Sequence, residues 1–179
     1  MKPNLTIPIL GCLLFFTACI KDTDFDQAYD IGLTPEVELD LIYFNLDAGI
    51  FYDTITSTAV LTARDTTDLR FLNDSEIKDN LRRAEFYFEF TNSIPRDFEV
   101  DFQFLSEEND TTYTAQTQVS SGTNSSPVVT EFIENVEGGA IGDLTDAHKV
   151  VVSVTIPSSS ANLDGTLSLQ SKTTYYLEF

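Results

Sequence analysis

The sequence predicts an all-β protein, an antiparallel β-sandwich of about seven to nine strands with one short helix. Several stretches alternate apolar and polar residues with a period of two, which is the pattern of half-buried strands. Residues typical of turns separate these stretches at intervals of roughly ten residues, as in sandwiches built from short strands. Only one stretch has the capping residues and the spacing of a helix.

The first strand is expected just after Pro35. In this stretch one face carries Val37, Leu39, Leu41 and Tyr43, and the other carries Glu36, Glu38, Asp40 and Ile42. Short strands are also expected at 50–54 and 69–72, with a run rich in threonine and β-branched residues at 55–63. The helix is predicted from about Ser75 to Leu81, because potential capping residues precede it and Ile77 and Leu81 are four residues apart.

The strongest alternation comes next and supplies the predicted core. One stretch places Ala84, Phe86, Phe88 and Phe90 on one face, and after residues 92–96 a second stretch does the same with Phe98, Val100, Phe102 and Phe104. Two alternating strands joined by a short segment containing Pro95 predict a hairpin. Burial of each of the six phenylalanines contributes about 1.5–3 kcal/mol, so this aromatic stripe is interpreted as core and not as a cofactor site.

Four further strands are expected at 112–119, 127–133, 150–156 and 167–179. Loops are expected at 120–126 and 158–164, and a short irregular connection at 140–147. The number and spacing of the strands resemble an immunoglobulin-like sandwich. The resemblance extends to the architecture alone, because the chain has no tryptophan and its 2 cysteines both lie before the predicted strands.

The N-terminus has the layout of a secretory signal. Lys2 precedes an apolar segment at about 5–16, and the small residues Thr17 and Ala18 then lead to Cys19. This segment is shorter than the ~20 apolar residues of a transmembrane helix. A cysteine directly after small residues resembles the lipobox of bacterial lipoproteins, which implies that Cys19 is lipidated and becomes the first residue of the mature chain.

Cys12 also follows a lipobox-like string, but an apolar core that ended there would be too short for a secretory signal. The predicted organisation is therefore a cleaved signal peptide at 1–18, a lipidated cysteine with a flexible acidic tether at 19–34, and a β-sandwich domain at 35–179.

The residues after Cys19 resemble the export signal of Bacteroidota-type surface lipoproteins. The residues that carry this resemblance are Lys21, Asp22, Asp24 and Asp26. The resemblance implies an outer-membrane lipoprotein that faces the cell exterior, and the periplasmic face is the alternative. These charges could instead only keep the tether solvated. The alternate acids also match the opening of an EF-hand loop, but Gln27 and Leu33 stand where that loop needs Gly and Glu.

Composition limits the function classes. The formal net charge of −19 argues against nucleic-acid binding, because such a body repels phosphate backbones. The chain has one histidine, His148, expected at the start of a strand, and no Gly-x-Ser-x-Gly turn. We therefore expect no enzyme, no catalytic or metal-binding residue, no small-molecule substrate and no cofactor beyond the lipid, although surface carboxylates could bind calcium weakly.

Three functions fit this description. The first is an accessory subunit that contacts a larger outer-membrane protein. The second is a glycan-binding surface module, for which the sequence offers Tyr87, Tyr113, Tyr175 and Tyr176. The third is a subunit of a fibre or surface layer that assembles by strand exchange, with residues 167–179 as the exchanged strand. An exposed tyrosine cluster would favour the second and an unfilled groove the third.

Overall fold

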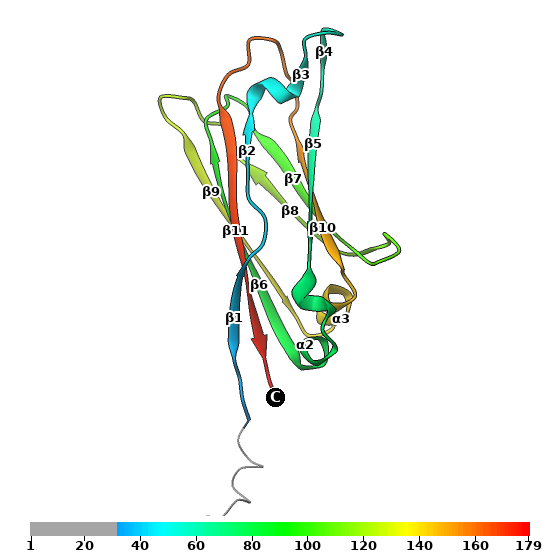
Figure 1. Ribbon diagram of the computed structural model, residues 1–179. Coiled ribbons are helices and arrows are strands. Elements are labelled where there is room, and N and C mark those ends of the chain that lie inside the picture. The colour runs from blue at the N-terminus through cyan, green and yellow to red at the C-terminus, as the bar shows by residue number, and fades with distance from the viewer. Residues whose placement is uncertain (1–31) are drawn as a thin grey trace, which may run out of the picture. The chain divides into compact units, whose positions relative to one another are not determined.

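The computed structural model describes residues 32–179, of which Leu33–Phe179 form one compact unit. Two antiparallel sheets pack face to face in this unit (Figure 1). The five-stranded sheet contains β1 (Glu36–Asp40), β2 (Phe44–Asp47), β11 (Thr166–Leu177), β6 (Leu81–Asn92) and β9 (Val128–Glu137). The four-stranded sheet contains β5 (Thr62–Asp68), β10 (Lys149–Thr155), β7 (Phe98–Leu105) and β8 (Thr111–Val119). The protein is therefore an antiparallel β-sandwich, as the sequence predicts.

Within each sheet, the order of strands differs from their order in the chain. The five-stranded sheet runs β1-β11-β6-β9, and β2 also pairs with β11; the four-stranded sheet runs β5-β10-β7-β8. A separate pair joins β3 (Tyr52–Asp53) to β4 (Thr58–Ala59). The last strand of the chain, β11, therefore lies inside a sheet and is paired along both of its edges.

The helical segments are short. The expected helix is present as α2 (Ser75–Asn80), and the Asp74 side chain caps it by accepting hydrogen bonds from the backbone N–H groups of Glu76 and Ile77. The prediction of a strand at 69–72 is wrong. These residues belong mostly to a 3-10 helix, η4 (Arg70–Asn73), with Leu72 in the core. The connection expected to be irregular contains a second helix, α3 (Ala140–Thr145). A further 3-10 helix, η3 (Ala48–Phe51), precedes β3.

The predicted phenylalanine hairpin is wrong in its pairing and right in its faces. β6 pairs with β11 and β9, whereas β7 pairs with β10 and β8. The segment between β6 and β7 therefore crosses from one sheet to the other as an arch. All six phenylalanines are at most 1% exposed. Alternation determines which face of a strand is buried. The apolar faces of two strands are buried equally well in a hairpin and in two strands that face each other across the core.

Asn92, at the end of β6, holds the arch together. Its side chain is 0% exposed, and its amide nitrogen donates to the backbone oxygens of Arg96 and Ser120, each at 2.9 Å. Its side-chain oxygen accepts from the backbone N–H of Ile94 at 2.8 Å. One buried amide thus joins the β6–β7 arch to the loop that follows β8, and its own polar atoms are satisfied.

The first edge of the five-stranded sheet contains a β-bulge. Asp40 lies opposite Lys172 and Phe44 lies opposite Leu169, so three residues, 41–43, face two residues of β11. As a result, Ile42 is 3% exposed and Tyr43 is 80% exposed. The sequence predicted the reverse assignment of these two side chains to faces. One extra residue in a strand reverses the alternation that follows it.

The two ends of the described unit meet. The backbone groups of Leu33 and Phe179 exchange hydrogen bonds, with N···O distances of 3.1 and 2.8 Å. This pairing begins two residues before Pro35, where the sequence places the start of the domain. Figure 1 shows this end of the sandwich, near α2, opposite the end that carries β3 and β4. Among residues 32–179, no helix is both long and apolar enough to cross a membrane.

Candidate functional site

The residues predicted for anchoring and export lie outside the described part of the chain: Cys19, Lys21, Asp22, Asp24 and Asp26. His148 directly precedes β10, where its backbone pairs with Leu69 and Leu105, so it is the strand-end residue that the sequence predicts. Within residues 32–179, no group of three or more His, Cys, Asp or Glu side chains is arranged to hold a metal ion.

The four tyrosines proposed for a glycan platform do not form one cluster. Tyr175 is 2% exposed, and its ring lies 4.7 Å, centroid to centroid, from that of Phe71. Tyr113 is half-buried on the edge strand β8, where its hydroxyl donates to Glu134. Tyr87 and Tyr176 do share the outward face of the five-stranded sheet.

The ring of Tyr176 is already covered on that face. The guanidinium carbon of Arg83 lies 3.8 Å from the centre of the ring, a cation–π contact. On the outward face of the five-stranded sheet, Tyr87 lines a surface depression. The bulge supplies the tyrosine that the sequence did not suggest, Tyr43.

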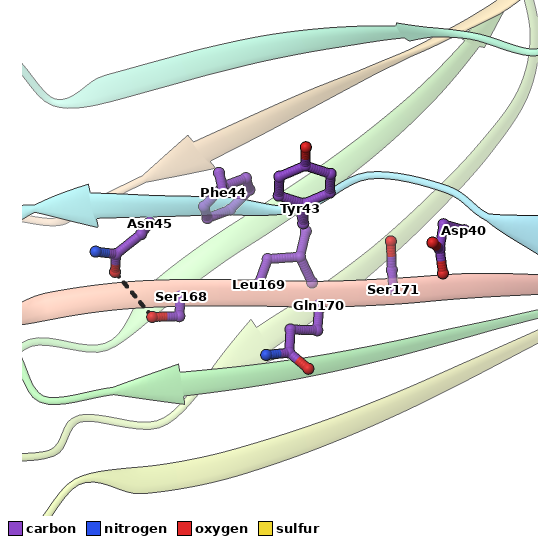
Figure 2. Close-up of a pocket in the computed structure, with 8 residues that line it drawn as sticks. All are labelled: Asp40, Tyr43, Phe44, Asn45, Ser168, Leu169, Gln170 and Ser171. Carbon is purple, nitrogen blue, oxygen red and sulfur yellow. Dashed lines mark hydrogen bonds between the residues drawn. The ribbon is translucent and has the colours of Figure 1, made fainter.

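A notch of about 560 Å³ opens at the bulge. It lies where the edge strand leaves β11 between β1 and β2, and Figure 2 shows its lining. The residues that line it are Asp40, Tyr43, Phe44, Asn45, Ser168, Leu169, Gln170 and Ser171. The Ser168 hydroxyl donates to the Asn45 side-chain oxygen at 2.9 Å, and the Ser171 hydroxyl donates to the backbone oxygen of Ile42 at 2.6 Å.

A second depression, of about 170 Å³, adjoins the notch. It shares Asp40, Gln170 and Ser171 with the notch and adds Tyr87, Glu89 and Lys172. The register explains this grouping, because Asp40, Lys172 and Tyr87 lie side by side on β1, β11 and β6. We call the two connected depressions the outer trough.

Hydrogen bonds fix the charge states at the far side of the outer trough. The Lys172 ammonium lies 2.7 Å from a Glu38 carboxylate oxygen, and this hydrogen bond raises the pKa of Lys172. The Tyr87 hydroxyl lies 2.7 Å from Glu131 and 3.2 Å from Glu89. The bond to Glu131 is the main cause that raises the pKa of Tyr87 well above its usual range. At neutral pH the trough therefore presents an ammonium group and a neutral phenol.

A different surface lies at the end of the sandwich opposite Leu33 and Phe179. We call residues 52–61, which comprise β3, a turn and β4 with its next two residues, the distal hairpin. Residues 54–62 are all exposed, and none of them is charged. Ile55 at the turn is 94% exposed, and Val60 and Leu61 are 41% and 42% exposed.

The distal hairpin is held at its tip. The Asp53 carboxylate accepts from the backbone N–H groups of Ile55 and Thr56, at 2.8 and 3.2 Å. A hydrogen bond from the Thr56 side chain, followed by these two backbone bonds, lowers the pKa of Asp53. Ser57 has a φ of 55°, and the hydroxyls of Thr56 and Thr58 are 2.7 Å apart.

The base of the distal hairpin is held by the core. Phe51 is 0% exposed, and its ring lies 5.5 Å from that of Phe98. The backbone N–H of Val60 donates to the Phe51 carbonyl at 2.9 Å. From the sequence, 55–63 is described only as a run rich in threonine and β-branched residues, although the absence of charge from 54 to 63 is a sign of this surface.

No protein-family model matches the sequence, and no curated protein matches it. Some solved structures are similar in fold. One is a "putative secreted protein" from Parabacteroides distasonis, with a TM-score of 0.47 and 15% identity over 64% of this chain and 37% of that chain. Another is the VP2 subviral particle of infectious bursal disease virus, with a TM-score of 0.44 and 8% identity over 80% of this chain and 32% of that one.

A third is the enzymatically active domain of tailspike protein 4 from bacteriophage CBA120, with a TM-score of 0.39 and 12% identity over 83% of this chain and 19% of that one. The chain thus spans about a third or less of the length of the viral proteins and 37% of the bacterial one. The protein is an antiparallel β-sandwich with an open trough on one sheet. At one end it carries a hairpin whose exposed residues, 54–61, are uncharged.

Proposed function

We propose that this protein is a lipoprotein anchored by Cys19 on the outer face of the outer membrane, where it acts as a non-enzymatic interaction subunit of a protein assembly. The observation that carries the proposal is the distal hairpin. It holds Ile55 at 94% exposure, and Figure 1 shows its strands β3 and β4 at the end of the sandwich opposite α2 and the C-terminus.

The hairpin is a suitable protein contact because its exposed residues from Thr54 onward carry no charge and include Ile55, Val60 and Leu61, and because the hairpin is held in place. Contiguous exposed apolar residues on a soluble domain commonly mark an interaction site. The chain carries 29 acidic residues, and none of them lies between Thr54 and Ala63. A partner can therefore cover this tip without burying an unpaired carboxylate.

A lipid on Cys19 would place the partner and the hairpin at the same membrane. The segment between Cys19 and Leu33 reaches at most roughly 50 Å when fully extended, so the sandwich stays close to the bilayer. Tethering raises the effective concentration of a binding surface for partners held nearby. A moderate intrinsic affinity of the hairpin is then sufficient.

The strand-exchange alternative would require a larger rearrangement. β11 pairs with β6 from Leu167 to Leu177, and its other edge pairs with β1 and β2. Exchange of this strand would break both sets of backbone hydrogen bonds. The hairpin needs no such step.

Crosslinking in intact cells tests the proposal. A photoreactive residue is placed at Ile55 of the full-length lipoprotein, and the matched control carries it at Ile133, which is 52% exposed on β9. We expect one outer-membrane protein to be crosslinked from position 55 and not from position 133. We also expect the Ile55→Asp variant to lose that protein on purification in mild detergent. Unchanged co-purification with Ile55→Asp, or equal crosslinking from both positions, would contradict the proposal.

A further inference from the structure

We propose that the outer trough binds a neutral oligosaccharide chain. This site is separate from the distal hairpin and lies on the outward face of the five-stranded sheet. Two tyrosines, Tyr43 and Tyr87, contribute to its two depressions, and Asp40 and Gln170 line both. The arrangement combines aromatic rings with side chains that donate and accept hydrogen bonds, which is what a sugar ring with its C–H face and its hydroxyls requires.

Part of the polar lining of the trough has no hydrogen-bond partner in the described part of the chain. Within residues 32–179, the side chains of Asp40, Tyr43 and Gln170 make no hydrogen bond to the protein. Asp40 can accept hydrogen bonds from two sugar hydroxyls, and the Gln170 amide can both donate and accept. On the far side, Lys172 and the Tyr87 hydroxyl are already placed by Glu38 and by Glu131.

The bulge is the reason that an aromatic ring is available. Three residues of the edge strand face two of β11, so the chain turns Ile42 into the core and leaves Tyr43 80% exposed. Figure 2 shows the Tyr43 ring beside the notch, with Gln170 on the other side of it. A largely exposed aromatic ring next to unpaired polar groups can stack on an apolar sugar face without displacing any part of the core.

The charges of the trough select a neutral ligand. Asp40, Glu38, Glu89 and Glu131 lie on the same outward face, and the ammonium of Lys172 is already paired with Glu38. An acidic polysaccharide or a phosphate would be repelled.

The shape of the trough favours a chain over a single sugar. The two depressions are connected through Asp40, Gln170 and Ser171, and they extend across the edge strand, β11 and β6. Both are open to solvent on the flat face of the sheet, so an oligosaccharide can continue beyond the site in either direction.

Calorimetric titration tests the inference with the purified full-length lipoprotein. The probes are neutral gluco-, manno-, galacto- and xylo-oligosaccharides of roughly four to six units, with an oligogalacturonate as the acidic comparison. We expect at least one neutral probe to bind and the acidic one not to bind. The Tyr43→Ala and Gln170→Ala variants should each weaken binding by about tenfold or more.

Three control variants separate this site from other causes. Tyr43→Phe keeps the ring and should retain binding within a few fold, and Tyr113→Phe alters a tyrosine of the other sheet. Ile55→Asp alters the distal hairpin and should leave sugar binding unchanged, so failure of one proposal is distinguishable from failure of the other. Because Tyr43 is exposed, its replacement by alanine should leave the melting temperature unchanged. Absence of binding to every neutral probe, equal binding by Tyr43→Ala, or a preference for the acidic probe would overturn the inference.

Discussion

The ring of Phe88 lies 4.1 Å, centroid to centroid, from the ring of Phe102, and the two side chains come from facing sheets. A second pair, Phe86 and Phe104, meets in the same way at 5.2 Å with an edge-on geometry. These contacts, from β6 to β7 across the interior, form the centre of the core. Such pairs add about 0.5–1.5 kcal/mol beyond the burial of their area.

Replacement of Phe88 by alanine should lower the free energy of unfolding by about 3–5 kcal/mol, because it leaves a cavity between the sheets. Phe102→Ala should cost a similar amount. The double variant should lose less than the two single variants combined, since both remove the same contact. Urea denaturation measures all three, with the exposed Tyr43→Ala as the control. Strict additivity would contradict the direct packing of the two rings.

Replacement of Asn92 by alanine should cost about 2–3 kcal/mol or more. The change leaves the backbone groups of Ile94, Arg96 and Ser120 without their buried partner. Asn45→Ala is the matched control, because the Asn45 amide makes its one hydrogen bond at the surface and its loss should cost less than about 0.5 kcal/mol. Equal melting temperatures for the two variants would show that Asn92 does not hold the arch.

Gly165 should not tolerate a side chain. Its φ is 113°, and a Cβ atom there would lie 2.5 Å from the backbone oxygen of Ser93. Gly165→Ala should therefore destabilise the protein by more than about 1 kcal/mol. Gly139→Ala is the comparison, because Gly139 has a helical φ of −63° and no atom within 4 Å of the added carbon. This variant should be neutral or slightly stabilising, by up to about 1 kcal/mol. The same loss of stability at both positions would contradict the argument.

Stability should fall at alkaline pH through the buried phenols. Burial raises the pKa of Tyr175 to about 12, and burial with a hydrogen bond to Glu134 raises the pKa of Tyr113 to about 12. A group whose pKa is higher in the folded than in the unfolded protein stabilises the folded protein. This contribution is complete below the unfolded pKa, near 10, and is lost as the pH rises towards 12. Urea denaturation at pH 8 and pH 11.5 should show a smaller loss for Tyr175→Phe than for the unmodified protein, by about 1–3 kcal/mol.

The loss of stability at alkaline pH needs a control variant that removes a phenol hydroxyl elsewhere. Tyr43→Phe removes an exposed hydroxyl, and it should lose as much stability between the two pH values as the unmodified protein does. An identical loss in all three proteins would show that Tyr175 does not carry the effect.

The membrane anchor should depend on one of the two cysteines. Cys19→Ala should release the protein from the membrane fraction or leave it unprocessed, whereas Cys12→Ala should change neither its location nor its mass. Mass spectrometry of the mature N-terminus should find a lipid-bearing Cys19 as the first residue. A mature chain that starts elsewhere would contradict the signal-peptide assignment.

The sequence by itself determined the fold class and the faces of the core strands. The side chains from Phe86 to Phe90 and from Phe98 to Phe104 lie on the predicted sides, because alternation is a local property of an extended chain. It also predicted the cap of α2 and the strand-end position of His148. These features depend on residues that are close together in the chain.

Tertiary structure decided which strands pair and where surface sites form. β6 and β7 are adjacent in the sequence, but the pairing of β6 with β11 spans more than 70 residues, and no local pattern encodes that choice. The bulge at 41–43 likewise appears only in the register between the edge strand and β11, and it places Tyr43 on the surface. Because one extra residue reverses the two faces of a strand, the outer trough could be located only after the register was known.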